Sequence, residues 1–206
     1  MIFLHGGKMN DTKTGGKSLQ RLYSRNEFFS RSRELIDSHE PGYYILSCSN
    51  IENFKLINDQ YGTKVGDMVL EHIAESIFNS MERIGGISAH IAGDDFAMLF
   101  PAEFADADEM AVSYDEASSP GCIDKKIRLR VGRFLVSMPN VPVESMYDHA
   151  KIAANSIKGN YDKNIAYYND LMRNELVRKQ QIVYEMESAL SNGQFEPWFQ
   201  PQYNHA

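Results

Sequence analysis

The sequence has few cysteines, no excess of positive charge and no long apolar run, and each absence excludes a class of protein. Only two cysteines occur among 206 residues, Cys48 and Cys122, and they form no CxxC pair. This number is too small for a disulfide framework or a cysteine zinc site, and it is typical of reduced thiols inside the cell. We therefore expect a cytoplasmic protein.

Positive charge is also scarce, since 21 Lys and Arg residues face 28 Asp and Glu residues and leave a net charge of −7. Binding of duplex nucleic acid requires a basic surface that neutralises phosphates, so we expect no nucleic-acid partner and only a small phosphate ligand. No stretch approaches the roughly 18 apolar residues of a membrane span, so no membrane contact is expected from this segment.

The residues that are present suit a globular protein, because a 43% hydrophobic fraction suffices for a packed core. Residues 1–17 are rich in Gly, Lys and Thr without periodicity, and they are predicted to be a flexible leader. The segment 14–18, TGGKS, is similar to the end of a phosphate-binding P-loop. However, the first glycine of that motif would fall on Asp11 and no strand leads into it, which favours a solvated linker.

Hydrophobic periodicity predicts an α/β (α+β) fold in which helices pack against a sheet. The alternation of helical and strand patterns begins with a helix closed by Pro41-Gly42 and includes one β-hairpin, whose turn is supplied by Gly93-Asp94. The predicted order is a helix over 19–36, a strand over 43–49, a helix over 65–78, a hairpin of 87–91 and 96–100, a strand over 127–136 and a helix over 145–158.

The pattern changes near the C-terminus, where residues 169–192 are predicted to form a long polar linker helix stopped by Asn192-Gly193. Its apolar residues recur at 4-, 7-, 3- and 4-residue steps, which is close to the period of a packed helical stalk. These residues are Met172, Leu176, Val183, Met186 and Leu190. Residues 195–199 then have the composition of a strand. A lone strand cannot bury its faces, so residues 193–206 are predicted to begin a second domain.

The most informative segment is 50–67, NIENFKLINDQYGTKVGD, followed by the hairpin AGDDF at 92–96. Together these resemble the GGDEF family of diguanylate cyclases. That family has a strand ending in Asp-x-Asp, then FKxINDxYG, then Gly-Asp before a helix, and finally GG(D/E)EF in a hairpin. The resemblance covers about residues 18–168. It implies a palm-like, mixed and mostly antiparallel sheet flanked by helices, which binds GTP, and homodimers that make cyclic dimeric GMP.

Asn58 and Asp67 match the family's guanine-binding positions. A carboxylate that accepts hydrogen bonds from N1–H and the 2-amino group, beside an amide, distinguishes guanine from adenine by its donor pattern. The alternative is that Asn58 stabilises a turn and Asp67 caps the following helix.

Lys55 and Lys158 match family lysines that approach the triphosphate, so the resemblance implies that they bind phosphate. The alternative for each is a solvated surface lysine, which is the usual location of this residue type.

The resemblance also implies a Mg²⁺ site and a catalytic site at the hairpin. Asp94 and Asp95 fall on the catalytic positions, and Asp94, Asn50 and Ile51 fall on the metal positions. Two of these depart from the family pattern, because Asn50 replaces an Asp and Asp95 replaces a Glu. A neutral amide removes one negative charge and weakens binding of a hard dication. Glu52 could reach inward from the same strand face, although an exposed glutamate is the simpler expectation.

Ala92 replaces the first glycine of the hairpin and adds one methyl group beside the phosphates. Three further departures weaken the expectation of catalysis. His90 stands where an Arg commonly precedes the hairpin, Asp162 stands where the family commonly has an Arg, and the segment 19–22, LQRL, replaces Leu-Thr-Gly-Leu. The family's inhibitory product site, Arg-x-x-Asp, is reduced to the segment 83–86, RIGG, so we expect no high-affinity feedback binding there.

The tail 194–203, QFEPWFQPQY, resembles the opening strand of EAL-type phosphodiesterase domains, which often follow GGDEF domains. The favoured hypothesis is therefore a degenerate GGDEF domain that binds GTP and regulates a following EAL domain, with cyclase activity weak or lost. The alternative is an active diguanylate cyclase that converts two GTP molecules to cyclic dimeric GMP with Mg²⁺.

Overall fold

The computed structural model describes residues 18–105, 127–160 and 162–201. The chain divides into two compact units, 1–168 and 169–206, and each is described separately below. The leader predicted at 1–17 lies outside the described residues, as does Cys122.

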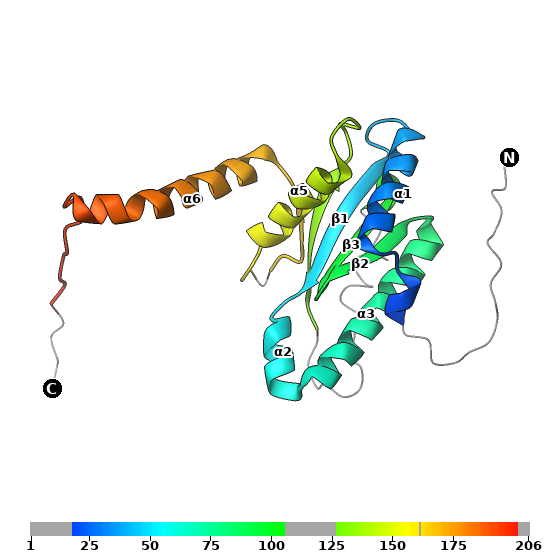
Figure 1. Ribbon diagram of the computed structural model, residues 1–206, viewed down its shortest axis with the longest axis horizontal. Helices are drawn as coiled ribbons and strands as arrows, with labels where there is room; N and C mark the ends of the chain where they lie inside the picture. Colours follow the sequence, from blue (N-terminus) through cyan, green and yellow to red (C-terminus); the bar gives the residue numbers. More distant parts are fainter. Residues whose placement is uncertain (1–17, 106–126, 161, 202–206) are drawn as a thin grey trace. The chain divides into compact units, whose positions relative to one another are not determined.

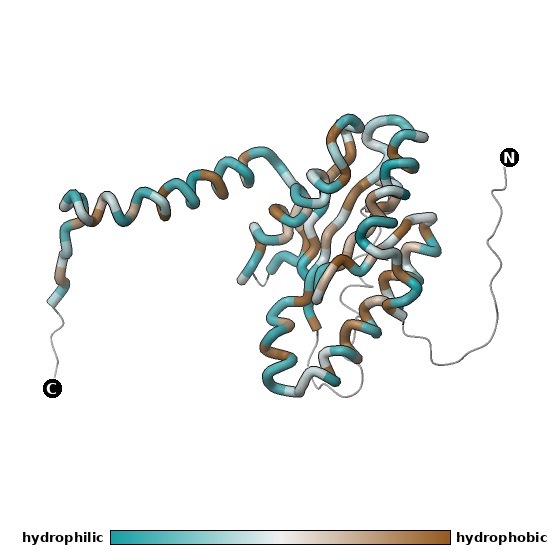
Figure 2. Tube along the Cα trace, viewed as in Figure 1, coloured by the Kyte–Doolittle hydropathy of each residue, from teal (hydrophilic) through white to brown (hydrophobic). Residues whose placement is uncertain are grey.

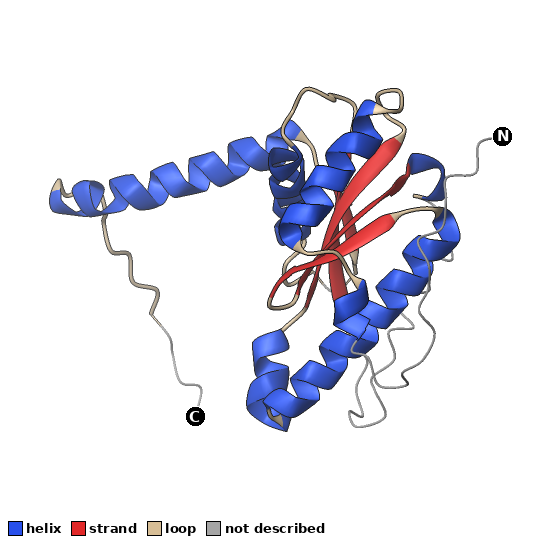
Figure 3. Ribbon diagram, turned by 45° about the vertical axis from the view of Figure 1, so that its right-hand side comes forward, coloured by secondary structure: helices blue, strands red, loops and turns tan. Residues whose placement is uncertain are grey.

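A five-stranded sheet forms the centre of the first unit (Figure 3). Its strand order is β2-β3-β1-β4-β5, and neighbouring strands are antiparallel except for the parallel pair β4 and β5. This mixed, mostly antiparallel sheet confirms the predicted fold class. The strands are β1 Tyr44–Ile51, β2 Ile87–Ala92, β3 Asp95–Pro101, β4 Leu129–Leu135 and β5 Ile165–Tyr167.

Helices cover both faces of this sheet (Figure 1). On one face α1, Arg25–Asp37, and α5, Val143–Ser156, bury apolar side chains against alternate residues of the strands. On the other face α3, Thr63–Ile84, buries its apolar side in a second cluster. Figure 2 shows apolar residues along the central strands, and the strands contribute buried side chains to both clusters. A shorter helix, α2, Phe54–Tyr61, connects the end of β1 to α3.

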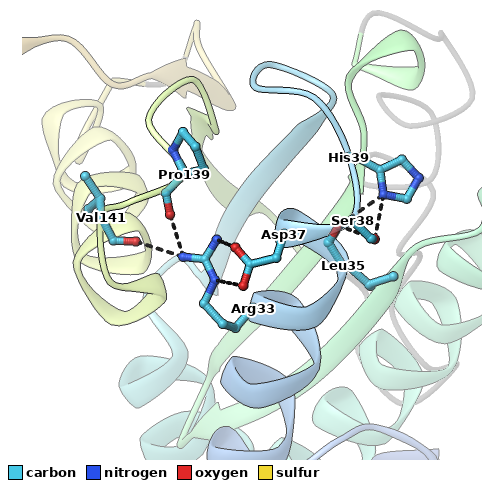
Figure 4. Close-up of polar contacts among 7 residues, drawn as sticks. All are labelled: Arg33, Leu35, Asp37, Ser38, His39, Pro139 and Val141. Carbon is cyan, nitrogen blue, oxygen red and sulfur yellow. Dashed lines mark hydrogen bonds and ion pairs between the residues drawn. The ribbon is translucent and has the colours of Figure 1, made fainter.

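Helix α1 is joined to the segment before α5 by Arg33 (Figure 4). Its guanidinium donates two hydrogen bonds to the Asp37 carboxylate one turn away, and Nη1 also donates to the backbone oxygens of Pro139 and Val141. The backbone oxygen of Leu35 accepts from Ser38 at the end of α1. The bonds from Arg33 connect α1 to the segment that leads into α5.

Gly132 lets α5 lie directly on β4. A Cβ atom at this position would be 1.8 Å from the backbone oxygen of Ala150 and 2.4 Å from the backbone nitrogen of Ala154. Since both atoms belong to the helix backbone, no side chain can replace this glycine without moving α5 away from the sheet.

The structure differs from the prediction at four elements. The helix predicted from residue 19 is a 3₁₀ turn, Ser18–Arg21, followed by α1, because Ser24 caps the helix with its hydroxyl oxygen accepting from the backbone nitrogen of Glu27. The short elements α2 and β5 were not predicted, since each contains too few residues to show a period. Residues 195–199 form no strand in the described part of the chain, and the prediction that they begin a second domain stays a prediction.

The second unit contains α6, Asp170–Ser191, which confirms that a helix occupies the predicted linker segment. Asn169 caps its start, and its side-chain oxygen accepts from the backbone nitrogen of Met172 at 3.1 Å. The helix ends at Ser191, and it is followed by Asn192 and by Gly193, which has a φ of +66°. Within the ranges that the structure describes, no helix has the length and apolar character that crossing a membrane requires.

Candidate functional site

The candidate site lies at the edge of the sheet where β1 ends and the β2–β3 hairpin turns. Asn50, near the end of β1, pairs in register with Asp95 of β3 on one side and with Arg130 of β4 on the other. Side chains directly opposite each other share a face of the sheet. The face of this trio also carries Leu46 and Cys48 of β1, and it is the face that α1 and α5 cover.

Asp94 lies in the hairpin turn, next to Gly93, whose φ is +56°. One carboxylate oxygen of Asp94 accepts a hydrogen bond from the backbone nitrogen of Ile51 at 3.1 Å. This bond brings two of the expected metal positions together across the strands. Burial raises the pKa of Asp94, with a smaller contribution from the charge of Asp95, while hydrogen bonds and Arg130 oppose the rise.

Asp95 forms an ion pair with Lys151 of α5, with 2.6 Å between Oδ2 and Nζ. The Asp95 side chain is 18% exposed and the Lys151 side chain 42% exposed. The hydrogen bond to Asp95 raises the pKa of Lys151, and partial burial opposes the rise. Lys151 thus remains charged, and the carboxylate that the sequence assigned to catalysis already has a counter-ion.

Two polar groups beside the acids have no hydrogen-bond partner among the described residues. Oδ1 of Asn50 is fully buried, and so are Nε and Nη1 of Arg130. Arg130 as a whole is only 7% exposed. Buried polar groups in proteins are nearly always hydrogen-bonded, so these atoms are exceptions at the place where the two acids lie.

The two expected guanine-binding residues lie together on the α2–α3 pair. Asn58 belongs to α2, and its Oδ1 lies over the α-carbon of Gly66, where a Cβ atom would be 1.9 Å away. Asp67 follows Gly66 in α3 and is exposed. Because Gly66 has no side chain, the Asn58 amide can lie against the backbone of Gly66, one residue before Asp67.

Each of the two expected phosphate-binding lysines is exposed near an end of a helix. Lys55 lies in the first turn of α2, where Asn53 has a φ of +58° and offers no side-chain cap to the helix. Lys158 follows the end of α5 at Ser156. The start of α2 has no side-chain cap from Asn53, and N–H groups at a helix N-terminus favour anions.

Glu52 differs from its simpler expectation, since its side chain is only 8% exposed rather than solvated. Its carboxylate pairs with Nε of Arg128 at 3.5 Å, and the same guanidinium donates to the backbone oxygens of Asn160 and Lys163. These contacts connect the end of β1 to the segment after α5. Glu52 therefore has a structural partner. Asp162 is exposed on that segment.

These residues do not fit a Mg²⁺ ion well. A hard dication prefers several carboxylate oxygens, yet the described residues contain no group of three His, Cys, Asp or Glu side chains that could hold a metal. Asn50 is neutral, Asp95 is paired with Lys151, and one oxygen of Asp94 already accepts a backbone hydrogen bond.

Sequence reasoning missed Lys151 and Arg130. Arg130 had a signal, because it interrupts an otherwise apolar strand pattern, IRLRVGRFLV. Lys151 had none, since a lysine among the alanines of α5 is usually a solvated residue.

Comparison with known proteins shows the family. Residues 18–164 match the family described as diguanylate cyclase, GGDEF domain, and the chain belongs to this family. It is similar to an uncharacterized protein, y4lL, of Sinorhizobium fredii, with 25% identity over 98% of this chain and 24% of the relative. It is also similar to the biofilm architecture maintenance protein MbaA of Vibrio cholerae, with 23% identity over 90% of this chain and 25% of the relative. The chain thus spans about a quarter of the length of these curated relatives.

Solved GGDEF domains share the fold of the first unit. The GGDEF domain of DgcB from Caulobacter crescentus, in complex with c-di-GMP, has a TM-score of 0.62 at 23% identity over 78% of this chain and 98% of that chain. The GGDEF domain of PA1120 from Pseudomonas aeruginosa has a TM-score of 0.61 at 22% identity over 77% and 97% of the two chains. At these identities the likeness shows the fold alone.

Proposed function

We propose that this chain is a degenerate GGDEF domain that binds GTP and regulates a following EAL-type domain through α6, without appreciable cyclase activity. The observation that carries this proposal is the ion pair between Asp95 and Lys151. A catalytic carboxylate must be available to the reacting groups, whereas this one is held by a lysine of its own domain. Asn50 removes a second acid from the same edge of the sheet.

Guanine recognition is supported by separate residues. Asn58 and Asp67 are present, and Gly66 allows the Asn58 amide to lie beside the start of α3. Lys55 and the uncapped start of α2 offer positive charge and N–H donors to phosphates. A domain with these features can bind the nucleotide even when it does not convert it.

The regulatory part of the proposal is supported by α6 and the tail. The helix begins directly after the sheet domain, and the tail 194–203 resembles the opening strand of an EAL domain. The curated relatives are about four times as long as the matched region, which leaves room for such a domain in a longer protein.

Titration calorimetry with GTP and ATP tests the proposal. GTP is expected to bind at least about ten times more tightly than ATP, because adenine would leave the Asp67 carboxylate without its donors. Asp67→Ala should remove that preference, whereas Asp59→Ala, which changes an exposed acid on α2, should keep it. Equal affinity for the two nucleotides would reject guanine binding. In a protein where an EAL-type domain follows this chain, GTP should also change the rate of cyclic dinucleotide hydrolysis.

The alternative is an active diguanylate cyclase acting as a homodimer on two GTP molecules. It is favoured by the convergence of Asp94, Asp95 and the buried Asn50 oxygen at one edge of the sheet. Chromatographic detection of cyclic dimeric GMP from the purified chain with GTP and Mg²⁺ distinguishes the two functions. Sustained product formation would establish the cyclase.

A further inference from the structure

Two cations and two acids lie together at the end of the sheet. Asp94 and Asp95 come from the hairpin, Lys151 from α5 and Arg130 from β4. The Lys151 ammonium is 2.6 Å from Asp95, and Arg130 acts electrostatically on Asp94. The two negative charges are therefore balanced by two positive charges of the same chain, and the fifth residue of the group, Asn50, is neutral.

Arg130 is an independent sign that this place receives an anion. Only 7% of the Arg130 surface is exposed, and neither Nε nor Nη1 has a hydrogen-bond partner in the described part of the chain. By strand register, its side chain lies on the sheet face that Asn50 and Asp95 share. An arginine in this position retains donors that match two oxygens of a phosphate.

Lys151 also retains donors for a ligand. An ammonium group has three N–H donors, and among the described residues Asp95 is the hydrogen-bond acceptor of Lys151. With 42% of its side chain exposed, Lys151 can contact a phosphate from solvent while it stays paired with Asp95.

We propose that Lys151 and Arg130 replace the divalent cation at this site, so that the domain binds the phosphates of its nucleotide directly and without Mg²⁺. This inference rests on the proposed function for the identity of the nucleotide. The replacement of the metal by the two cations can be tested without any nucleotide. A dication at this site would be repelled by the two positive charges of Lys151 and Arg130, and the two carboxylates would not outnumber those charges. A phosphate would meet the two cations.

The first experiment uses a metal alone. Titration of Mn²⁺ against the apoprotein, followed by the loss of its free electron paramagnetic resonance signal, measures binding without nucleotide. The dissociation constant of the unchanged chain for Mn²⁺ should be above about 1 mM, which is weaker than that of dedicated carboxylate sites. Lys151→Met should bind Mn²⁺ at least about tenfold more tightly, because Asp95 is released. Lys163→Met, the loss of an exposed lysine at the same end of the sheet, is the matched control and should change nothing.

The second experiment compares GTP binding in Mg²⁺ and in EDTA. The two dissociation constants of the unchanged chain should agree within about twofold, and Lys151→Met should weaken binding in EDTA by about tenfold. Arg130→Lys keeps a positive charge and controls for loss of folding, with circular dichroism as the check on each variant. The affinity of Arg130→Lys for GTP should fall less than that of Arg130→Gln.

The outcomes separate the inference from the proposed function. GTP binding that requires Mg²⁺ in the unchanged chain would overturn the inference and leave GTP binding intact. Failure to bind GTP under either condition would reject the proposed function. The Mn²⁺ titration would then still decide the inference, because tight Mn²⁺ binding by the unchanged chain, or no gain in Lys151→Met, contradicts it.

Discussion

The side-chain oxygen of Asn58 lies directly over the α-carbon of Gly66, with only 1.9 Å between that oxygen and the position that a Cβ atom would occupy. Asn58 belongs to α2 and Gly66 to the first turns of α3. The absence of one methyl group therefore sets where the amide of Asn58 lies relative to Asp67.

The first prediction concerns Gly66→Ala. Alanine in a helix is favoured over glycine by about 0.5–1 kcal/mol, and the conflicting atom is the end of a side chain that can rotate away, so stability should be unchanged or slightly higher. GTP affinity should fall several-fold because Asn58 is displaced. Chemical denaturation and calorimetry on the same sample measure both. Unchanged GTP affinity would remove Asn58 from guanine recognition.

The second prediction concerns the contact between α5 and β4. Gly132→Ala places a methyl group 1.8 Å from the backbone oxygen of Ala150, so the free energy of unfolding should fall by about 3 kcal/mol or more. Gly159→Ala is a suitable comparison, because nothing lies within 4 Å of its Cβ position and its φ of +78° costs about 1 kcal/mol for a side chain. Urea unfolding gives both values. A similar loss in the two variants would contradict the close approach of α5.

A pH-dependent gain in stability is predicted for Asp94→Asn. Burial raises the folded-state pKa of Asp94 above its usual 3.8, so the contribution of its protonation to folding is complete below pH 3.8 and is lost as the pH rises through the folded-state value. The neutral amide avoids that loss. The variant should therefore melt at a higher temperature than the parent at pH 7, by about 2–4 °C for each kcal/mol.

This gain should shrink as the pH falls through the folded-state pKa and disappear below pH 3.8, as Asp94 becomes protonated in both states. Thermal unfolding from pH 3.5 to 8 follows the difference. Asp59→Asn, at an exposed position, should show no such dependence. A gain that is equal at all pH values would exclude the ionisation of Asp94 as its cause.

Cys48 is predicted to resist alkylation. It is buried in β1, and burial raises the pKa of its thiol to about 12, so about one thiol in ten thousand is ionised at pH 8. Iodoacetamide should modify it only when the domain unfolds. Mass spectrometry of the peptide that contains Cys48, in buffer and in denaturant, measures the difference. Equal labelling under the two conditions would show that β1 is accessible.

Restoring the acids of the family is expected to be insufficient by itself. Asn50→Asp with Asp95→Glu returns a negative charge and one methylene group, but Lys151 can still pair with the longer acid. Addition of Lys151→Met should raise the formation of cyclic dimeric GMP well above that of the double variant. Equal product from the double and triple variants would show that Lys151 does not hold the acid back.

Much of the fold is predictable because long periodic segments carry strong signals. The apolar steps of α3 and α5 and the hairpin turn at Gly93 all identify their elements. Short elements such as α2 and β5 depend on their neighbours, which a local pattern does not contain. The split between residues 18–21 and α1 has a signal in Ser24, a residue type that commonly caps helices.

The candidate site is only partly predictable for a related reason. Asp94, Asp95 and Asn58 belong to continuous motifs, so the sequence places them directly. The partners of the acids depend on which distant side chain the fold brings near, and Lys151 reaches Asp95 only because α5 packs on that face of the sheet. Glu52 shows the same effect, since Arg128 buries a side chain that local reasoning left in solvent.

The pair of Asp95 and Lys151 also affects how relatives of this chain can be sorted. A hairpin signature contains Asp94 and Asp95, and by that criterion both acids of this chain would count as present. Lys151, which forms the ion pair with Asp95, lies 56 positions later in the sequence. Any ranking of relatives by competence for catalysis therefore has to read the hairpin and the α5 position together, because a change at one alters the meaning of the other.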